Sequence, residues 1–170
     1  SGPMAASRSH PAACQVMAAH GSGIGFGLIA GKVLAEAVEG DGDPGAEATL
    51  WQYQSRFLRE FGATLAGYDA VRRMSVALGS VGVEELFASG VFSETLVRNG
   101  LSQRLGTLPP AQAAAAGRAL AARPAIARVV LPALAAMGTA RGLYRTYPTT
   151  PDPRAWALWR SVASRGRARS

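Results

Sequence analysis

Apolar residues recur every three to four positions between residues 46 and 78, which predicts one long amphipathic helix. The stripe consists of aromatic and aliphatic residues, namely Leu50, Phe57, Phe61, Leu65 and Tyr68, broadened by Trp51, Leu58 and Met74. Arg56 and Glu60 lie four positions apart on the outer face, so we expect them to pair. Gly62 and Gly67 are expected to weaken the helix locally and to bend it.

Residues 22–38 form a second predicted helix, in which apolar residues occur nearly all round. Such a pattern indicates a helix that is buried on most of its sides. Ser22 is a candidate N-cap. A run of glycine, aspartate and proline at residues 40–45 predicts the turn that ends the helix.

Shorter helices are predicted over residues 83–87, 93–103, 111–122 and 123–137, the last continuing less regularly to residue 147. Gly79 and Gly90 mark breaks between them, and Pro132 is expected to kink or divide the last helix. No segment shows the alternation of a strand, so we predict an all-α fold.

We divide the chain into four parts on this basis. Residues 1–13 have no periodicity and are expected to be a disordered or truncated N-terminus, and residues 14–40 hold a glycine turn with its buried helix. A helical domain follows at 41–147, and a proline linker with a basic, aromatic tail follows at 148–170.

The net charge of +7 is carried almost entirely by arginine, because Lys32 is the only lysine. This balance suits phosphate, carboxylate or anionic-lipid partners, although a codon bias towards arginine and alanine explains it equally well. Cys14 is the only cysteine, which rules out an internal disulfide and favours a reducing, cytoplasmic compartment. The most apolar segment, residues 129–137, is too short to predict a membrane span.

The sequence offers few groups for catalysis or metal binding. Two histidines and one cysteine cannot form a usual zinc set. No nucleophile–base motif or P-loop is present, so we assign no catalytic residue and no metal ligand. The arginines are scattered except in the tail, and nucleic acid is therefore not an expected partner.

The candidate binding site is the glycine turn formed by Gly21, Ser22, Gly23, Ile24 and Gly25. A glycine turn at a helix N-terminus directs several backbone N–H groups at one point, with the positive end of the helix dipole behind them. That arrangement suits an anion or an electron-rich ring edge. The alternative is that glycines at 25, 27 and 31 let the helix pack closely on a neighbour.

This stretch resembles the third flavin-contacting motif of FAD-dependent oxidoreductases related to geranylgeranyl reductases and flavoprotein monooxygenases. Ala12-Ala13 matches the alanine pair of that motif, residues 21–25 match its Gly-x-Gly-Ile turn, and residues 31–36 match its helix end. The sequence departs from the motif at His10-Pro11, where the family has Gly-Asp, and at Ala18, where it has proline. The carboxylate that would hold the ribityl–pyrophosphate part of FAD is therefore missing.

The resemblance implies that the amides of residues 21–25 lie near the pyrimidine edge of FAD. It further implies the C-terminal part of an oxidoreductase that acts on an apolar, isoprenoid or lipid-like substrate, with a reduced nicotinamide or ferredoxin as electron donor. An N-terminal portion or a partner chain would supply the α/β, Rossmann-like fold that binds the nucleotide. The isolated chain is then expected to bind FAD weakly or not at all and to be inactive. The alternative is a non-enzymatic helical module, derived from that family, that binds a lipid or a protein.

The C-terminal tail allows two interpretations. Trp156 and Trp159 share a helical face and are accompanied by five arginines, at positions 154, 160, 165, 167 and 169. An aromatic, basic helix suits peripheral attachment to an anionic membrane surface. The alternative is that the tryptophans pack on the helical body. Tyr144 and Tyr147, beside Arg141 and Arg145, likewise suit either a phosphate grip or an exposed helix end.

Overall fold

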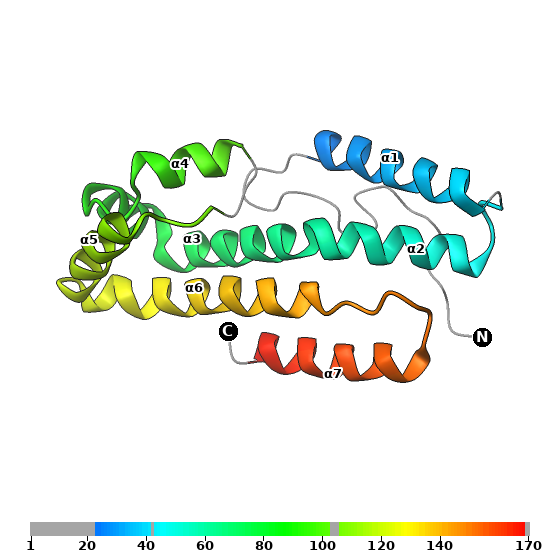
Figure 1. Cartoon of the computed structure of the whole chain (residues 1–170). Coiled ribbons are helices and arrows are strands. Elements are labelled where there is room, and N and C mark those ends of the chain that lie inside the picture. The colour runs from blue at the N-terminus through cyan, green and yellow to red at the C-terminus, as the bar shows by residue number, and fades with distance from the viewer. Residues whose placement is uncertain (1–22, 42, 103–105, 169–170) are drawn as a thin grey trace.

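The computed structural model describes residues 23–41, 43–102 and 106–168, which consist of helices joined by short connections (Figure 1). No strand occurs among these residues, which confirms the all-α prediction. The elements are, in chain order, α1 (Ile24–Asp41), α2 (Glu47–Phe57), η2 (Leu58–Gly62), α3 (Ala63–Ala88), α4 (Glu94–Leu101), α5 (Pro110–Ala121), α6 (Pro124–Arg145) and α7 (Pro153–Ala168).

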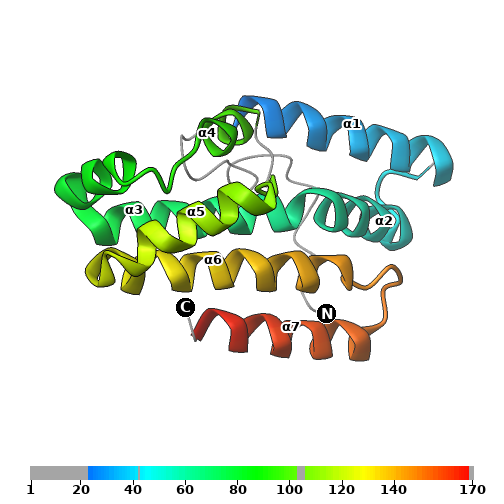
Figure 2. The same cartoon turned by 60° about the vertical axis from the view of Figure 1, so that its left-hand side comes forward.

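The helices α2, η2 and α3 form one rod through the middle of the molecule. In both views α1 and α4 lie on one side of this rod, α6 lies along the other side, and α7 lies outside α6 (Figures 1 and 2). The helix α6 packs along α3, α1 packs on α2, and α5 packs near the start of α6. The fold is therefore a stack of helical layers in which α7 is outermost at one side.

The predicted long helix is confirmed, and its ends follow from local backbone chemistry. Helical residues run from Glu47 to Leu78, and Gly79 interrupts them with φ +65° and ψ −178°. The last part of α3 corresponds to the short helix predicted over 83–87, and Gly90 follows it with φ +75°. Both φ values lie in the left-handed region, which residues with a β-carbon rarely adopt, so glycine is favoured at each break.

Two clusters of buried side chains hold the layers together. The first joins α1 to the middle rod and contains Phe26, Ala30, Val33, Ala37, Tyr53, Phe57 and Tyr68. The second joins α3 to α5 and α6 and contains Met74, Leu86, Val91, Leu120, Ile126 and Val130. The aromatic stripe predicted for residues 46–78 thus serves both sides of the rod, with Tyr68 in the first cluster and Met74 in the second.

Proline and serine begin several of the helices. Ser93 caps α4 by accepting a hydrogen bond from the Leu96 amide at 3.4 Å. Prolines occupy the first turn of α5, α6 and α7, where the missing N–H group costs no helical hydrogen bond.

The helix α6 runs without division through Pro132 to Arg145. Pro132 was expected to kink or divide this helix; the division did not occur, and residues 138–145 belong to the same helix. This longer helix is, by length and composition alone, apolar enough to cross a membrane. Such a single helix is weak evidence for a span, and α6 packs on both α3 and α7.

The rod contacts α6 at η2 as well as along α3. This segment is one turn of π-helix that ends at the buried Gly62, one of the two glycines expected to disturb the helix. A β-carbon on Gly62 would overlap the ring of Tyr144 on α6. The absence of a side chain at position 62 therefore lets an aromatic ring rest directly on the backbone of the rod.

Replacing Gly62 with alanine is expected to destabilise the chain by about 1–3 kcal/mol, because the added methyl group overlaps a packed ring. The control is Gly142→Ala on α6, where a β-carbon would meet no atom within 4 Å. That substitution should instead stabilise the helix by roughly 0.4–1 kcal/mol. Urea unfolding of both variants measures the two changes, and equal effects would contradict the steric explanation.

Candidate functional site

The predicted site lies at the N-terminal end of α1. Its first residues, Gly21 and Ser22, lie outside the described residues, as does the proposed cap on Ser22. The Gly27 amide donates to the Gly23 carbonyl at 2.8 Å, which is the first helical hydrogen bond of α1. Gly23 is therefore the capping position, and Ile24 and Gly25 already belong to the helix. The helix therefore begins at Ile24, two residues later than the predicted start at residue 22.

The amides of Ile24, Gly25 and Phe26 precede the first helical hydrogen bond. None of them has an acceptor within α1, because the first three N–H groups of a helix project from its end. No acidic side chain occurs in the first turn of α1. The end of the helix therefore presents amide donors and a partial positive charge to any acceptor that approaches it.

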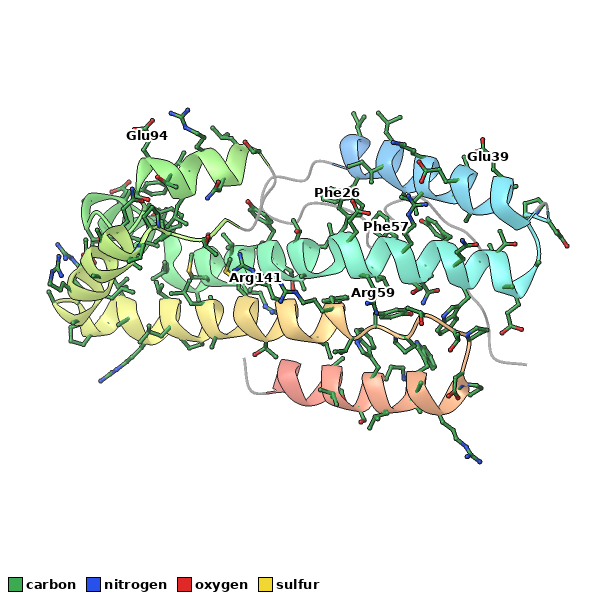
Figure 3. The ribbon with its side chains drawn as sticks, viewed as in Figure 1. Phe26, Glu39, Phe57, Arg59, Glu94 and Arg141 are labelled. Carbon is green, nitrogen blue, oxygen red and sulfur yellow. The ribbon has the colours of Figure 1, made fainter. Side chains whose placement is uncertain are left out.

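Only one side of α1 is buried among the described residues. Phe26, Ala30, Val33 and Ala37 are at most 5% exposed and face the middle rod, with the Phe26 ring edge-on to Phe61 at 5.9 Å. Figure 3 shows Phe26 and Phe57 in the layer between α1 and the rod. The expectation of a helix buried on most sides was therefore wrong for the opposite face.

The opposite face of α1 carries an exposed apolar stripe, which consists of Ile24, Leu28, Gly31 and Ala35. Ile24 is 84% exposed and Leu28 is 72% exposed. A β-carbon on Gly31 would meet nothing within 4 Å, so within the described residues this glycine serves no close helix contact. The alternative explanation, that these glycines let α1 pack closely on a neighbouring helix, is therefore not supported at Gly31.

The pairing of charged residues beside this helix differs from the prediction. Arg56 on α2 pairs with Glu36 on α1 at 2.5 Å, rather than with Glu60. Lys32 lies 3.7 Å from the same Glu36 carboxylate. The Arg56–Glu36 ion pair therefore connects α1 to α2, whereas the predicted pair would have lain within a single helix.

A second candidate site is a shallow hollow of about 500 Å³ beside α2 and η2. It is lined by polar and charged side chains, namely Gln52, Ser55, Arg56, Arg59, Glu60 and Thr149. Arg59 donates from Nη1 to the Tyr147 carbonyl at 2.9 Å, and Figure 3 shows its side chain on the α6 side of the rod. Both arginines that line the hollow have partners, since Arg56 pairs with Glu36 and Arg59 donates to the Tyr147 carbonyl.

The connection between α6 and α7 closes one side of this hollow. Tyr147 is 1% exposed and stacks on Trp51 with ring centroids 6.1 Å apart. Its hydroxyl accepts a hydrogen bond from the Gln54 amide, and the Trp51 indole N–H donates to the Pro148 carbonyl at 3.2 Å. Burial raises the pKa of the Tyr147 phenol, while hydrogen bonds with Gln54 and Trp156 oppose that rise.

The structure does not form the phosphate grip considered for the end of α6. Tyr147 is buried among aromatic rings rather than exposed, and Arg141 donates to the Gly106 carbonyl at 3.1 Å. Tyr144 lies edge-on to Trp159, at 5.5 Å between ring centroids. Sequence reasoning missed these contacts because Trp51 and Pro148 are 97 positions apart. The only indication of these contacts in the sequence was the high density of aromatic residues in α2.

The described residues contain no group of three His, Cys, Asp or Glu side chains that could hold a metal ion. His10, Cys14 and His20 lie outside those residues.

The buried tyrosines predict a loss of stability at alkaline pH. Because burial raises the pKa of Tyr68 and Tyr147 in the folded chain, unfolding releases their protons once the pH exceeds about 10, the unfolded value. Below that pH these two tyrosines should not change the free energy of unfolding. Above it, their ionisation should lower the free energy of unfolding. Tyr147→Phe should reduce the fall, measured by urea unfolding between about pH 8 and pH 11. If the free energy of unfolding falls equally steeply with pH in the variant and in the unaltered chain, Tyr147 does not contribute to the loss of stability.

In comparisons with known proteins, no protein-family model, curated protein or solved structure matched this chain.

Proposed function

We propose that this chain is the C-terminal helical part of an FAD-dependent oxidoreductase similar to geranylgeranyl reductases, which acts on an apolar, isoprenoid or lipid-like substrate. The proposal rests on the sequence motif around Gly23 and on one structural observation, the exposed apolar stripe of α1. The FAD would supply the redox chemistry when bound.

The stripe supports the proposal because of its spacing. Ile24, Leu28, Gly31 and Ala35 follow one another at steps of four, three and four residues, so they form one line along the helix. Together with the buried side, they give α1 two apolar faces, which is typical of a helix packed between two layers. A nucleotide-binding sheet is the second layer that the resemblance implies.

The N-terminal end of α1 also fits one part of a flavin site. The amides of Ile24, Gly25 and Phe26 would donate to the pyrimidine edge of the ring and would stabilise negative charge there. The first turn carries no acidic side chain to bind the ribose or to orient the ribityl chain. These residues would therefore orient the ring but would not hold the cofactor alone.

FAD is expected to bind the isolated chain with a dissociation constant no lower than about 1 mM, equivalent to roughly 4 kcal/mol. The physical reason is that the described residues supply only backbone donors at one edge of the ring. Flavin fluorescence during titration with the chain measures this constant. Submicromolar binding would show that the chain holds a complete site and would contradict its assignment as one part of the enzyme.

The chain purified from its natural host, through an affinity tag, is expected to carry FAD together with the nucleotide-binding part. Leu28→Glu should lower the flavin recovered per chain at least fivefold, because a buried carboxylate on the stripe would disrupt the packing of the second layer. Leu131→Glu on α6 is the matched control, since this leucine is 53% exposed but lies outside the stripe. Absence of flavin from the unaltered protein would favour the alternative function.

That alternative is a non-enzymatic helical module that binds a protein or a lipid. The same stripe favours it, because exposed isoleucine and leucine side chains on one line are typical of a helix that recognises an apolar partner. The recovered flavin distinguishes the two proposals, since a binding module would occupy the stripe without cofactor.

A further inference from the structure

The charges of the chain are divided unequally between its two parts. Residues 95–170 contain twelve arginines and one acidic residue, Asp152. Residues 1–94 contain six basic and ten acidic residues. The first group includes α6 and α7, which lie on one side of the rod, and the second includes α1, which lies on the other (Figures 1 and 2). The helices α6 and α7 contain arginines and no acidic residue, whereas α1 contains three acidic residues and one lysine. We call the side of α6 and α7 the basic side and the side of α1 the acidic side.

The helix α7 is the outermost layer on the basic side. Its inner face packs on α6 through Trp159 and Ala163, and the Trp159 indole N–H donates to the Leu143 carbonyl at 2.9 Å. Trp159 also lies edge-on to Tyr147, at 4.8 Å between ring centroids. The tryptophans predicted as membrane anchors therefore turn towards the body, as the alternative interpretation expected.

The outer face of α7 combines basic and aliphatic side chains. Leu158 is 66% exposed and Val162 is 44% exposed, and they lie one turn apart. Arg154 lies one turn before Leu158 and is exposed, as is Arg160, whose guanidinium lies over the Trp156 ring at 4.4 Å. No acidic residue occurs anywhere in α7. This face thus presents positive charge beside aliphatic groups, and the nearest acidic residue is Asp152, which precedes α7 and accepts a hydrogen bond from the Arg154 amide at 2.8 Å.

We propose that the outer face of α7 is a docking surface for an anionic lipid bilayer, on which the chain lies without crossing it. Guanidinium groups attract the phosphates and carboxylates of the headgroups, and Leu158 and Val162 enter the boundary with the acyl chains. A single-stranded nucleic acid would gain most from exposed aromatic rings, whereas Trp159 is turned inward. The proposal is independent of the proposed oxidoreductase function.

The test is sedimentation of the full chain with lipid vesicles. Vesicles with about one-third phosphatidylserine should bind the chain at low salt, and neutral phosphatidylcholine vesicles should not. Binding should weaken as salt rises, because the Debye length shortens to about 3 Å at 1 M. Arg154→Gln should weaken binding about fivefold, the factor that corresponds to about 1 kcal/mol per arginine at such a surface. Leu158→Ser should also weaken binding, without changing the charge.

The matched control is Lys32→Gln on α1, which removes the same unit of charge from the acidic side. The side chain of Lys32 is 77% exposed, so its loss should leave both the fold and vesicle binding unchanged. Equal losses from Lys32→Gln and Arg154→Gln would show attraction by net charge alone and would overturn the assignment to α7. Absence of vesicle binding, equal binding to neutral vesicles, or tighter binding to RNA than to the anionic vesicles would also overturn it.

Discussion

The contact between Gly62 and the ring of Tyr144 determines how closely the middle rod and α6 approach each other. Tyr144 in turn touches Trp159, and Trp159 touches Tyr147, which stacks on Trp51 of α2. This series of aromatic contacts begins and ends on the rod and includes α6 and α7 between. The position of the outermost helix therefore depends on one residue without a side chain.

The beginnings and ends of the helices could be predicted from sequence because they depend on local chemistry. Gly79 and Gly90 adopt backbone angles that other residues avoid, and Ser93 supplies a cap to its own helix. These effects involve neighbours in the chain and need no knowledge of the fold. Pro132 is the exception, since the packing of α6 on α3 maintains the helix despite the missing hydrogen bond.

The faces of the helices could not be predicted in the same way. In α1 both faces are apolar, so periodicity does not reveal that Phe26 faces the rod while Leu28 stays exposed. Arg56 had Glu60 within reach on its own helix, but Glu36 is available only once α1 has packed. The hollow beside η2 combines residues of α2 with Thr149, far along the chain. Of the glycine turn, the structure describes only the part from Gly23 onward.

The exposed apolar groups of α1 and α7 have different surroundings, and this difference separates the two proposed interfaces. The stripe of α1 includes the small residues Gly31 and Ala35, which leave room for another protein layer to pack closely, and the exposed Lys32 lies at its edge. Leu158 and Val162 on α7 lie beside arginine instead. A guanidinium group is costly to bury in a protein interface without a partner, but a bilayer surface leaves it hydrated.

The π-helical turn of η2 has a consequence for the register of the whole rod. It contains one more residue per hydrogen-bonded ring than an α-helix, so the residues after Gly62 are rotated by about 100° relative to an uninterrupted α-helix. After the turn, Tyr68 lies in the cluster that contains residues of α1, and Met74 lies in the cluster that contains residues of α6. Loss of a single residue from Leu58–Gly62 would restore α-helical geometry and would turn Met74 away from its present partners. The number of residues in this turn therefore determines the angular position of every side chain of α3 relative to those of α2.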